Sequence, residues 1–161
     1  MSTLVIAEHD NNNLKGSTLN TVAAAAQLGV DIHILVAGSN CENVISECQK
    51  IDGVAKVLNA NDSLYSNQLA EDLSLLVVSL SSDYANILAP ATTFGKNLMP
   101  RVAAKLDTQQ ISDIISVEAS DIFKRPIYAG SCIATVKSND AVKVITVRST
   151  AFDAVNQNNS N

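Results

Sequence analysis

Long hydrophobic runs are absent from this sequence, and so is any excess of positive charge. The longest apolar stretches, such as 73–80, span about eight residues, whereas a membrane-spanning helix needs about twenty. Lysine and arginine together number 11 against 16 aspartates and glutamates, which gives a net charge of −5 at pH 7. A nucleic-acid-binding protein needs a basic face to displace counterions, so this charge argues against that class.

Cysteine is also scarce. The three cysteines are Cys41, Cys48 and Cys132, and an odd number without a secretion signal favours reduced thiols. The first residues, 1–8, lack the basic region of a secretory signal and the arginine-rich composition of a transit peptide. We therefore expect a cytoplasmic protein, or a protein of the mitochondrial matrix from which a leader has been removed.

Glycine is too sparse for a phosphate-binding loop. The segment 8–16 after the first apolar run contains only Gly16, whereas a dinucleotide site uses G-x-G-x-x-G to let the backbone approach the pyrophosphate. Gly95-Lys96 is not a P-loop either, because Pro90 and Asn97 stand where glycine and serine or threonine are needed. The G-x-S-x-G, H-E-x-x-H and C-x-x-C motifs are absent too. The sequence therefore predicts a protein that is not an enzyme and has no active site of its own.

What the chain does contain is the pattern of one ordered α/β domain. It has 161 residues, of which 47% are hydrophobic and 17% charged. We predict strands at 3–8, 31–36, 54–58 and 84–90, alternating with helices at 17–28, 40–50, 67–80 and 91–107. Within the third helix, 75–78 also fits a strand. Alternation of strand and helix predicts a Rossmann-like, mostly parallel sheet flanked by helices.

The pattern changes in the last third of the chain. Four strands without intervening helices are expected at 111–118, 123–128, 132–137 and 141–148. Ser138 to Asp140 is expected to form a hairpin turn. These strands should add antiparallel strands to the parallel sheet or form a small sheet beside it. We expect the domain to span 1–153, with 154–161 as a polar linker or disordered tail.

The segment 91–107, ATTFGKNLMPRVAAKLD, combines a helical pattern with an internal proline. An apolar residue recurs every four positions and predicts one buried stripe, formed by Phe94, Leu98, Val102 and Leu106. Pro100 removes a backbone donor at a cost of about 3 kcal/mol in a helix interior, so we expect a kink or a second helix beginning there. The basic residues Lys96, Arg101 and Lys105 should then point away from the stripe.

His9 and Asp10 are the candidates for a polar ligand site. They follow the first predicted strand, at the carboxyl edge where open α/β sheets bind ligands. His9 could act as a general base or contact a ligand, although the sequence favours a solvent-facing loop residue. We expect His33, inside the second strand, to be structural. Two histidines without matching carboxylates or thiolates make a poor metal site, so none is predicted.

The same central segment carries a resemblance to a known family. The run ATTFGKNLMPRVAAKL followed by ISDI resembles the N-terminal domain of the electron transfer flavoprotein α subunit. The opening LVIAE and the later RPIYAG, ATV and VITVR, with Phe152 after them, continue the likeness in the same order. The resemblance covers nearly the whole chain. It implies a Rossmann-like fold related to the adenine-nucleotide α-hydrolase-like group.

The resemblance also implies a function. Proteins of this family are αβ heterodimers that carry one FAD and pass electrons from acyl-CoA and related dehydrogenases of fatty acid β-oxidation to a membrane quinone oxidoreductase. The β subunit holds AMP, and the FAD is held mainly by a second α domain, whose motifs we do not expect in these 161 residues. We therefore expect a scaffold and assembly domain that contacts the β subunit and does not hold FAD alone.

Two further expectations follow from this hypothesis. The interface with the partner should involve the proline-containing helix and the strand-rich third of the chain, at Phe94, Lys96, Arg101, Arg125 and Tyr128. The alternative function is a stand-alone adenine-nucleotide-binding module resembling universal stress proteins. Its site would lie around His9 and the start of the proline-containing helix.

Overall fold

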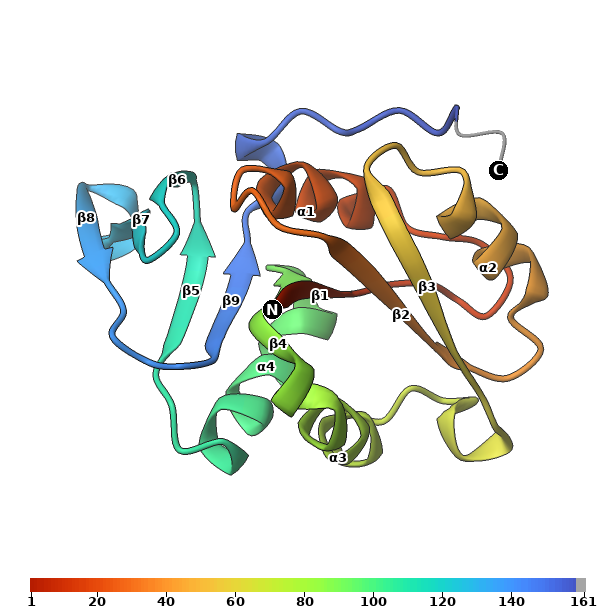
Figure 1. Ribbon diagram of the computed structural model, residues 1–161. Helices are drawn as coiled ribbons and strands as arrows, with labels where there is room; N and C mark the ends of the chain where they lie inside the picture. The colour runs from red at the N-terminus through yellow and green to blue at the C-terminus, as the bar shows by residue number, and fades with distance from the viewer. Residues whose placement is uncertain (159–161) are drawn as a thin grey trace.

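A computed structural model describes residues 1–158 as two separate β-sheets and four α-helices (Figure 1). The larger sheet has six strands in the order β3-β2-β1-β4-β9-β5, and every neighbouring pair is parallel. These strands are β1 (Ser2–Ile6), β2 (Ile32–Gly38), β3 (Val54–Asn61), β4 (Tyr84–Pro90), β5 (Gln110–Ile114) and β9 (Lys143–Val147). The parallel α/β architecture predicted from the alternation of strand and helix is therefore confirmed.

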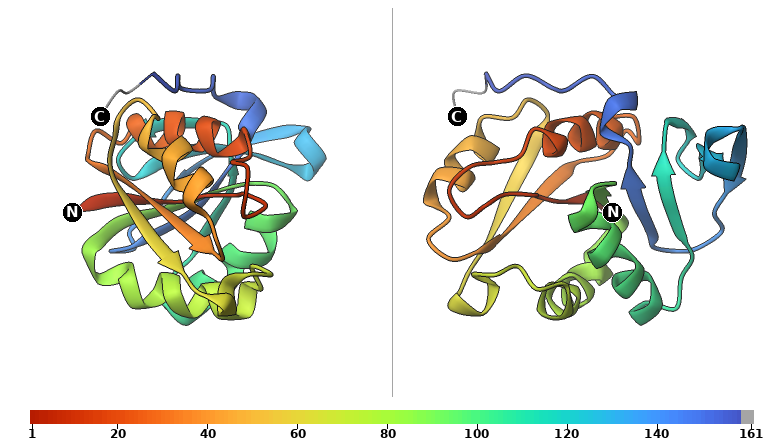
Figure 2. Two further views of the ribbon diagram at one scale, coloured as in Figure 1. Left: turned by 90° about the vertical axis from the view of Figure 1, so that its right-hand side faces the viewer. Right: turned by 180° about the vertical axis from the view of Figure 1, so that it is seen from behind.

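The helices lie in two layers, one on each face of this sheet (Figure 2). They are α1 (Ser17–Ala26), α2 (Glu42–Gln49), α3 (Ala70–Leu80) and α4 (Thr93–Lys105). Because successive side chains of a strand point to opposite faces, β1 contributes to both layers. Val5 packs in the cluster that contains residues of α1 and α2, whereas Leu4 and Ile6 pack in the cluster of α3 and α4. The hydrophobic core is thus divided by the sheet itself.

A second sheet of three antiparallel strands stands beyond β5, at the left of Figure 1. Its strands are β6 (Ser116–Ala119), β7 (Ile122–Ile127) and β8 (Cys132–Lys137). Of the two arrangements expected for the last third, the separate small sheet is therefore correct, and β5 and β9 join the main sheet in parallel. The expected hairpin at Ser138–Asp140 is wrong, because β8 and β9 belong to different sheets.

The strand expected at 111–118 divides between the two sheets. Its first part is β5 and its second part is β6. Asp113 has a left-handed backbone with φ of 61°, and the register of β5 against β9 breaks between Ile111 and Ile114. This bulge bends the chain away from the parallel sheet. The Asp113 carboxylate is held there by an ion pair with Arg148.

Helices α3 and α4, in the lower part of Figure 1, show which of the alternatives left open by the sequence are correct. Residues 75–78 are helical, because α3 continues to Leu80. Helix α4 runs without interruption through Pro100, so a second helix beginning there is wrong. Pro100 lies at the exposed surface of α4. Leu98 and Val102 are fully buried, while Lys96, Arg101 and Lys105 are exposed, as the four-residue spacing predicts.

After β9 the chain turns back over α1 and α2, along the top of Figure 1. The Phe152 carbonyl accepts a hydrogen bond of 2.7 Å from Asn20, and the Asn156 carbonyl accepts one of 3.0 Å from the backbone N–H of Asp52. Part of the tail expected at 154–161, residues 159–161, lies outside the described residues. None of the helices in residues 1–158 is long and apolar enough to cross a membrane.

Candidate functional site

The topological switch point of the main sheet lies between β1 and β4. The chain adds β2 and β3 on one side of β1 and then returns to place β4 on its other side. Helix α1 follows β1 on one face, and helix α4 follows β4 on the opposite face (Figure 1). The loops at the carboxyl ends of these two strands therefore separate, and in open α/β sheets this crevice is where ligands bind.

The carboxylate of Glu8 spans this switch point. Glu8 lies two residues after β1, and its Oε2 atom accepts hydrogen bonds from the Ser17 hydroxyl at 2.8 Å and the Thr92 hydroxyl at 2.9 Å. Ser17 begins α1, and Thr92 directly precedes α4. The carboxylate therefore ties the starts of two helices on opposite faces of the sheet. It also places a negative charge where a nucleotide phosphate would have to lie.

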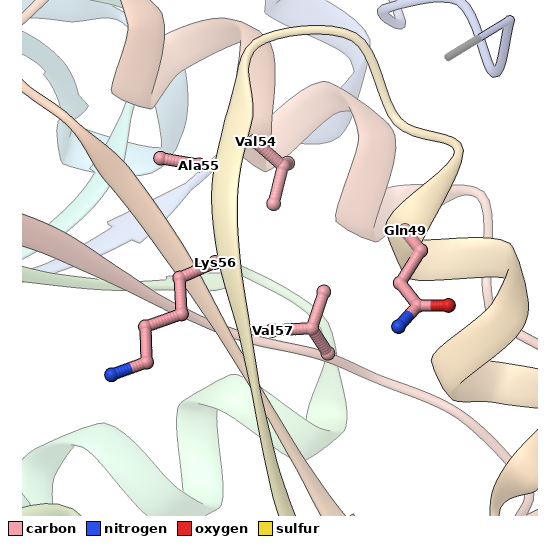
Figure 3. A pocket seen from close by; sticks show the side chains of 5 residues that line it. All are labelled: Gln49, Val54, Ala55, Lys56 and Val57. Carbon is pink, nitrogen blue, oxygen red and sulfur yellow. The ribbon is translucent and has the colours of Figure 1, made fainter. Parts of the chain in front are cut away.

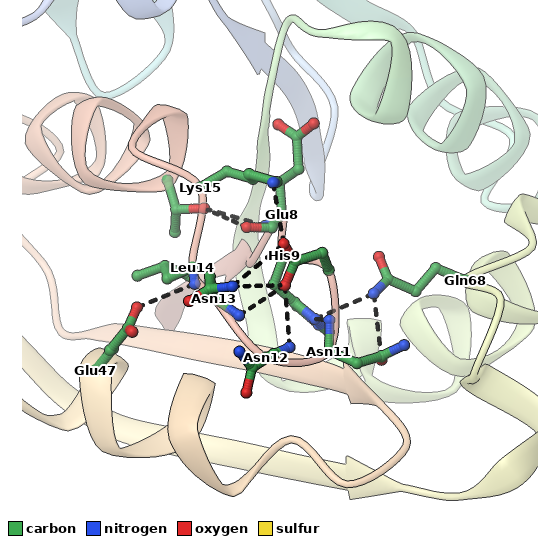
Figure 4. A network of polar contacts seen from close by, with 11 residues as sticks. Glu8, His9, Asn11, Asn12, Asn13, Leu14, Lys15, Glu47 and Gln68 are labelled. Carbon is green, nitrogen blue, oxygen red and sulfur yellow. Dashed lines mark hydrogen bonds and ion pairs between the residues drawn. The ribbon is translucent and has the colours of Figure 1, made fainter.

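His9 is buried, with 6% of its surface exposed, so its interpretation as a solvent-facing loop residue is wrong. Its Nδ1 atom accepts hydrogen bonds from the Asn11 backbone N–H at 3.0 Å and from the Gln68 amide at 3.1 Å (Figure 4). Because the backbone N–H can only donate, Nδ1 must be unprotonated. Burial lowers the pKa of His9, although its hydrogen bond to the backbone of Ala37 and the charge of Asp10 act in the opposite direction. The ring is therefore held neutral.

Asn11 fastens the loop after β1 to the loops after β2 and β3. Its amide nitrogen donates to the Ser66 carbonyl at 2.8 Å, and its amide oxygen accepts from the Ser39 backbone N–H at 3.2 Å and from the Cys41 thiol at 3.4 Å. The loops meet so closely that a side-chain carbon at Gly38 would overlap Asn11 and Cys41. The described residues at this end of the sheet thus fill the space with their own side chains.

Asp10 shapes the outer part of the same loop. Its carboxylate accepts hydrogen bonds from the backbone N–H groups of Asn12 and Asn13 at 3.1 and 2.7 Å and pairs with Lys15 at 3.2 Å (Figure 4). The N–H groups of Asn13 and Asn12, and then Lys15, hold the pKa of Asp10 far below its usual range. Asp10 therefore stabilises the fold of the loop.

Two pockets lie outside this network. One of about 380 Å³ adjoins the crevice and is lined by Asn67, Gln68, Ala70, Thr93, Phe94, Asn97 and Leu98. Another of about 330 Å³ lies against the edge strand β3, where Val54 and Val57 face Gln49 of α2 while Lys56 points away (Figure 3). The second pocket is remote from the switch point, and Lys56 is the one charged residue among those that line it. In residues 1–158 no three acidic, histidine or cysteine side chains gather as a metal site.

The five interface candidates fall into two groups. Lys96 and Arg101 are exposed on α4, and Tyr128 is 79% exposed at the turn between β7 and β8. Phe94 is half-buried, and it packs against the core cluster of α3 and α4. Arg125 is half-buried too, with two hydrogen bonds to Ser112. Only the first group presents its side chains freely to a partner.

Sequence reasoning missed the residues that close the crevice. The sequence pattern places Glu8 at the end of a strand, Asn11 in a loop and Gln68 in the helix predicted at 67–80, although α3 begins only at Ala70. A usable signal was present for Asn11, because asparagine tolerates the left-handed backbone better than most residues, and Asn11 has φ of 71°. No local signal identifies Gln68, which is 59 positions from His9 in the sequence.

Comparison with known proteins identifies the family. A family model described as "Electron transfer flavoprotein domain" matches residues 3–161. The chain belongs to the electron transfer flavoprotein family. It is 57% identical over 155 residues to the electron transfer flavoprotein subunit alpha of Pseudomonas aeruginosa, covering 96% of this chain and 50% of that protein. The resemblance inferred from the central segment is confirmed.

Other members of this family give the same picture. Identity is 48% to the electron transfer flavoprotein subunit alpha of Paracoccus denitrificans, over 98% of this chain and 51% of that protein. Identity is 50% to the mitochondrial electron transfer flavoprotein subunit alpha of Dictyostelium discoideum, over 93% of this chain and 44% of that protein. The chain thus spans about half the length of the curated relatives it matches. These relatives do not favour a stand-alone nucleotide-binding module.

The described residues at the switch point do not fit the pyrophosphate of FAD. A pyrophosphate site uses a glycine-rich turn and the free N–H groups at a helix start. Here Gly16 is the only glycine before α1, and the Glu8 carboxylate occupies the space between the two helix starts. Gly95, inside α4, leaves no room for a phosphate beside its Cα atom either, because the Pro90 carbonyl oxygen lies where a side-chain carbon would be. We therefore assign no step of flavin chemistry to these residues.

Proposed function

We propose that this chain is the N-terminal scaffold and assembly domain of an electron transfer flavoprotein α subunit. In the complete αβ protein, FAD would carry electrons from acyl-CoA and related dehydrogenases to a quinone oxidoreductase. The observation that carries the proposal is the closure of the switch-point crevice by Glu8, His9 and Asn11. A domain whose ligand crevice is filled by its own side chains contributes surfaces and rigidity. It is an electron-carrier component with no active site of its own.

The cofactors belong elsewhere under this proposal. FAD would be held mainly by the other half of the α subunit, and AMP by the β subunit. Support comes from the negative charge of Glu8 at the switch point, which opposes the phosphates of either cofactor. The protein would act in the bacterial cytoplasm or the mitochondrial matrix, as the bacterial and mitochondrial relatives suggest.

The exposed side of α4 is the first surface that we propose for the β subunit. The sequence of this helix contains three basic residues and no acidic one, in a chain whose net charge is −5. Lys96 and Lys105 take part in no ion pair within the described chain, and Arg101 pairs only with the exposed Glu71, at 2.8 Å. Exposed pairs of this kind are weak and exchange readily for other partners. The surface therefore suits an acidic region of a partner protein.

The turn that carries Tyr128 is the second proposed surface. Three successive residues, Tyr128, Ala129 and Gly130, have positive φ values of 49°, 52° and 90°. Two of them are not glycine, and a left-handed backbone at such residues costs about 1–2 kcal/mol each. The turn holds the Tyr128 ring away from the domain, and Ile133 on β8 is also 53% exposed. Exposed aromatic anchors of this kind contribute strongly to protein–protein binding.

Mixing experiments with the β subunit from the same organism test the proposal. We expect a complex with the 161-residue chain, measured by sedimentation velocity at concentrations of about ten micromolar. Lys96→Glu and Tyr128→Ala should each weaken it by about tenfold, whereas Lys56→Glu on the exposed edge of β3 should not. Failure of two folded partners to associate would contradict the scaffold role, as would equal effects of the Lys96 and Lys56 variants.

A further inference from the structure

Arg125 differs from the other two arginines in the described chain, because no carboxylate lies within ion-pair distance of it. Arg101 pairs with Glu71, and Arg148 pairs with Asp113. Arg125 is half-buried in β7 and forms only neutral hydrogen bonds. A partly desolvated guanidinium without a counter-charge is costly, since charges removed from water are ordinarily paired. This side chain is thus ready to bind an anion.

The geometry of Arg125 is fixed by Ser112 of β5. Its Nε atom donates to the Ser112 carbonyl at 2.7 Å, and its Nη2 atom donates to the Ser112 hydroxyl at 2.9 Å. These two bonds cross from the small sheet to the edge strand of the large sheet. Within residues 1–158, the third guanidinium nitrogen, Nη1, has no hydrogen-bond partner. An anion that binds this nitrogen would meet a side chain whose rotamers are already restricted, which reduces the entropic cost of binding.

Arg125 lines a cavity of about 350 Å³ where the two sheets separate. The cavity is also lined by Gln109, Gln110, Ile111, Val136, Lys137, Ser138, Asn139 and Asp140. This volume is at the lower end of the range typical of small-molecule sites, roughly 300–1,000 Å³. The lining combines two cations, one carboxylate, several amides and two aliphatic side chains. It therefore resembles a site for a small ligand that has both a charge and an apolar part.

The one carboxylate that lines this cavity, that of Asp140, already accepts hydrogen bonds from neighbouring residues. The Asp140 carboxylate accepts a hydrogen bond of 3.1 Å from the Gln109 backbone N–H and one of 3.3 Å from the Ser138 hydroxyl. The Gln109 N–H group, as the largest cause, holds the pKa of Asp140 below its usual value. Lys137, by contrast, is bound loosely, because its contact with Asp121 is 3.4 Å long and its own side chain is 61% exposed. Lys137 can therefore turn toward a ligand.

We propose that this cavity binds a small carboxylic acid in its ionised form, with a short aliphatic body. The carboxylate lies against the free nitrogen of Arg125 and the ammonium of Lys137, and the aliphatic body contacts Ile111 and Val136. The free nitrogen of Arg125 can donate a charge-assisted hydrogen bond to a carboxylate oxygen, which is stronger than one between neutral groups. A ligand with more charge would find a single fixed cation and one loosely held cation, which favours a monoanion over phosphate.

The test is an NMR titration of the whole 161-residue chain with butyrate, following the Nε–H signal of Arg125. We expect a saturable shift with Kd on the order of 1 mM, which is reasonable for six non-hydrogen atoms. Acetate should bind more weakly, because it lacks the aliphatic body, and butylammonium should not bind. Inorganic phosphate at equal ionic strength should produce no saturable shift. N-acetylaspartate α-amide, in which only the side-chain carboxylate is free, represents a carboxylate supplied by a partner protein. It should bind more weakly than butyrate.

Variants separate binding at this site from general effects of charge. Lys137→Gln should weaken butyrate binding at least about threefold, and Arg125→Gln at least about tenfold. Lys56→Gln, the same change on the remote edge strand β3, should have no effect. If Arg125→Gln loses its folded spectrum, the Lys137 variant and the wild-type Arg125 signal still decide the matter. An unsaturable shift, tighter binding of phosphate or the aspartate derivative, or equal effects of the two lysine variants would overturn the proposal.

Discussion

Thr92, the residue before α4, donates a hydrogen bond of 2.9 Å to the carboxylate of Glu8, which follows β1. The two residues are 84 positions apart in the sequence and follow β1 and β4, the two strands that flank the switch point. Ser17 donates to the same oxygen from the start of α1. One acidic side chain thus connects both helical layers at the place where related folds admit a ligand. The stability and the closure of this edge of the sheet therefore depend on the same atoms.

Replacing Glu8 by alanine should destabilise the protein by about 1–2 kcal/mol, because two partly buried hydroxyl groups lose their acceptor. Glu8→Gln should cost less, since an amide oxygen can still accept. Urea unfolding followed by circular dichroism measures the change. Asp153→Ala, at an exposed residue, is the control and should stay within about 0.5 kcal/mol of the wild type. Equal stability of Glu8→Ala and the wild type would show that the bridge contributes nothing.

The stability of the domain should fall as the pH is lowered through the range in which histidine is protonated. The folded-state pKa of His9 is lowered, so the unfolded chain binds a proton first. The contribution of His9 is therefore fully present above the unfolded pKa of about 6.5 and is lost as the pH falls toward the folded value. The slope should be at most about 1.4 kcal/mol per pH unit. Urea unfolding midpoints between pH 7.5 and 5 measure this slope, on the wild type and on His9→Gln, which lacks the titrating group. If the two midpoint curves run parallel, His9 is not the cause of the pH dependence.

Gly95 should not tolerate a side chain. A methyl group there would overlap the carbonyl oxygen of Pro90, so α4 would have to move away from β4. Gly95→Ala should therefore destabilise the domain by about 1–3 kcal/mol despite the better helix propensity of alanine. Gly16→Ala provides the matched comparison, because Gly16 has a helical backbone with φ of −57° and no atom within 4 Å of the added carbon. It should be neutral or stabilising by about 0.4–1 kcal/mol. Thermal unfolding in which the two variants behave alike would refute this account.

Pro100→Ala should stabilise the chain by about 2 kcal/mol. Alanine restores the missing backbone donor to the Lys96 carbonyl and removes the clash, and proline costs about 3 kcal/mol for the two together. The unfolded chain becomes more flexible without proline, which offsets up to about 1 kcal/mol of this stabilisation. Pro100 is exposed, so no packing contact of the core is lost. Loss of stability in urea unfolding would instead indicate that Pro100 is needed for α4 to bury Leu98 and Val102.

The helix of residues 91–107 shows how much of the fold could be predicted from the sequence. The recurrence of an apolar residue every four positions predicts this helix, with one buried stripe. It also predicts that Lys96 and Arg101 are exposed, because they lie away from that stripe. Its continuity through Pro100 could not be predicted, because the cost of proline in a helix is offset by burial of neighbouring side chains. The sequence contains no measure of that burial.

The candidate site was less predictable than the fold. His9 was identified by its position after β1, but the hydrogen bond that it accepts from Gln68 comes from a different loop. The expectation for Arg125 concerned an interface and did not include its hydrogen bonds to Ser112 or the cavity beside it. Such contacts arise when segments that are distant in sequence meet at one edge of the sheet.

The sequence by itself determined the alternation of strands and helices, the parallel sheet and the family, because these follow from local patterns of apolar residues and from an ordered run of identities. Only the tertiary structure decided that the run 111–118 divides between two sheets, since pairing depends on which strand edges are available. Only the tertiary structure placed Glu8 between Ser17 and Thr92. Each of those hydrogen bonds joins residues that come together only after the sheet has assembled.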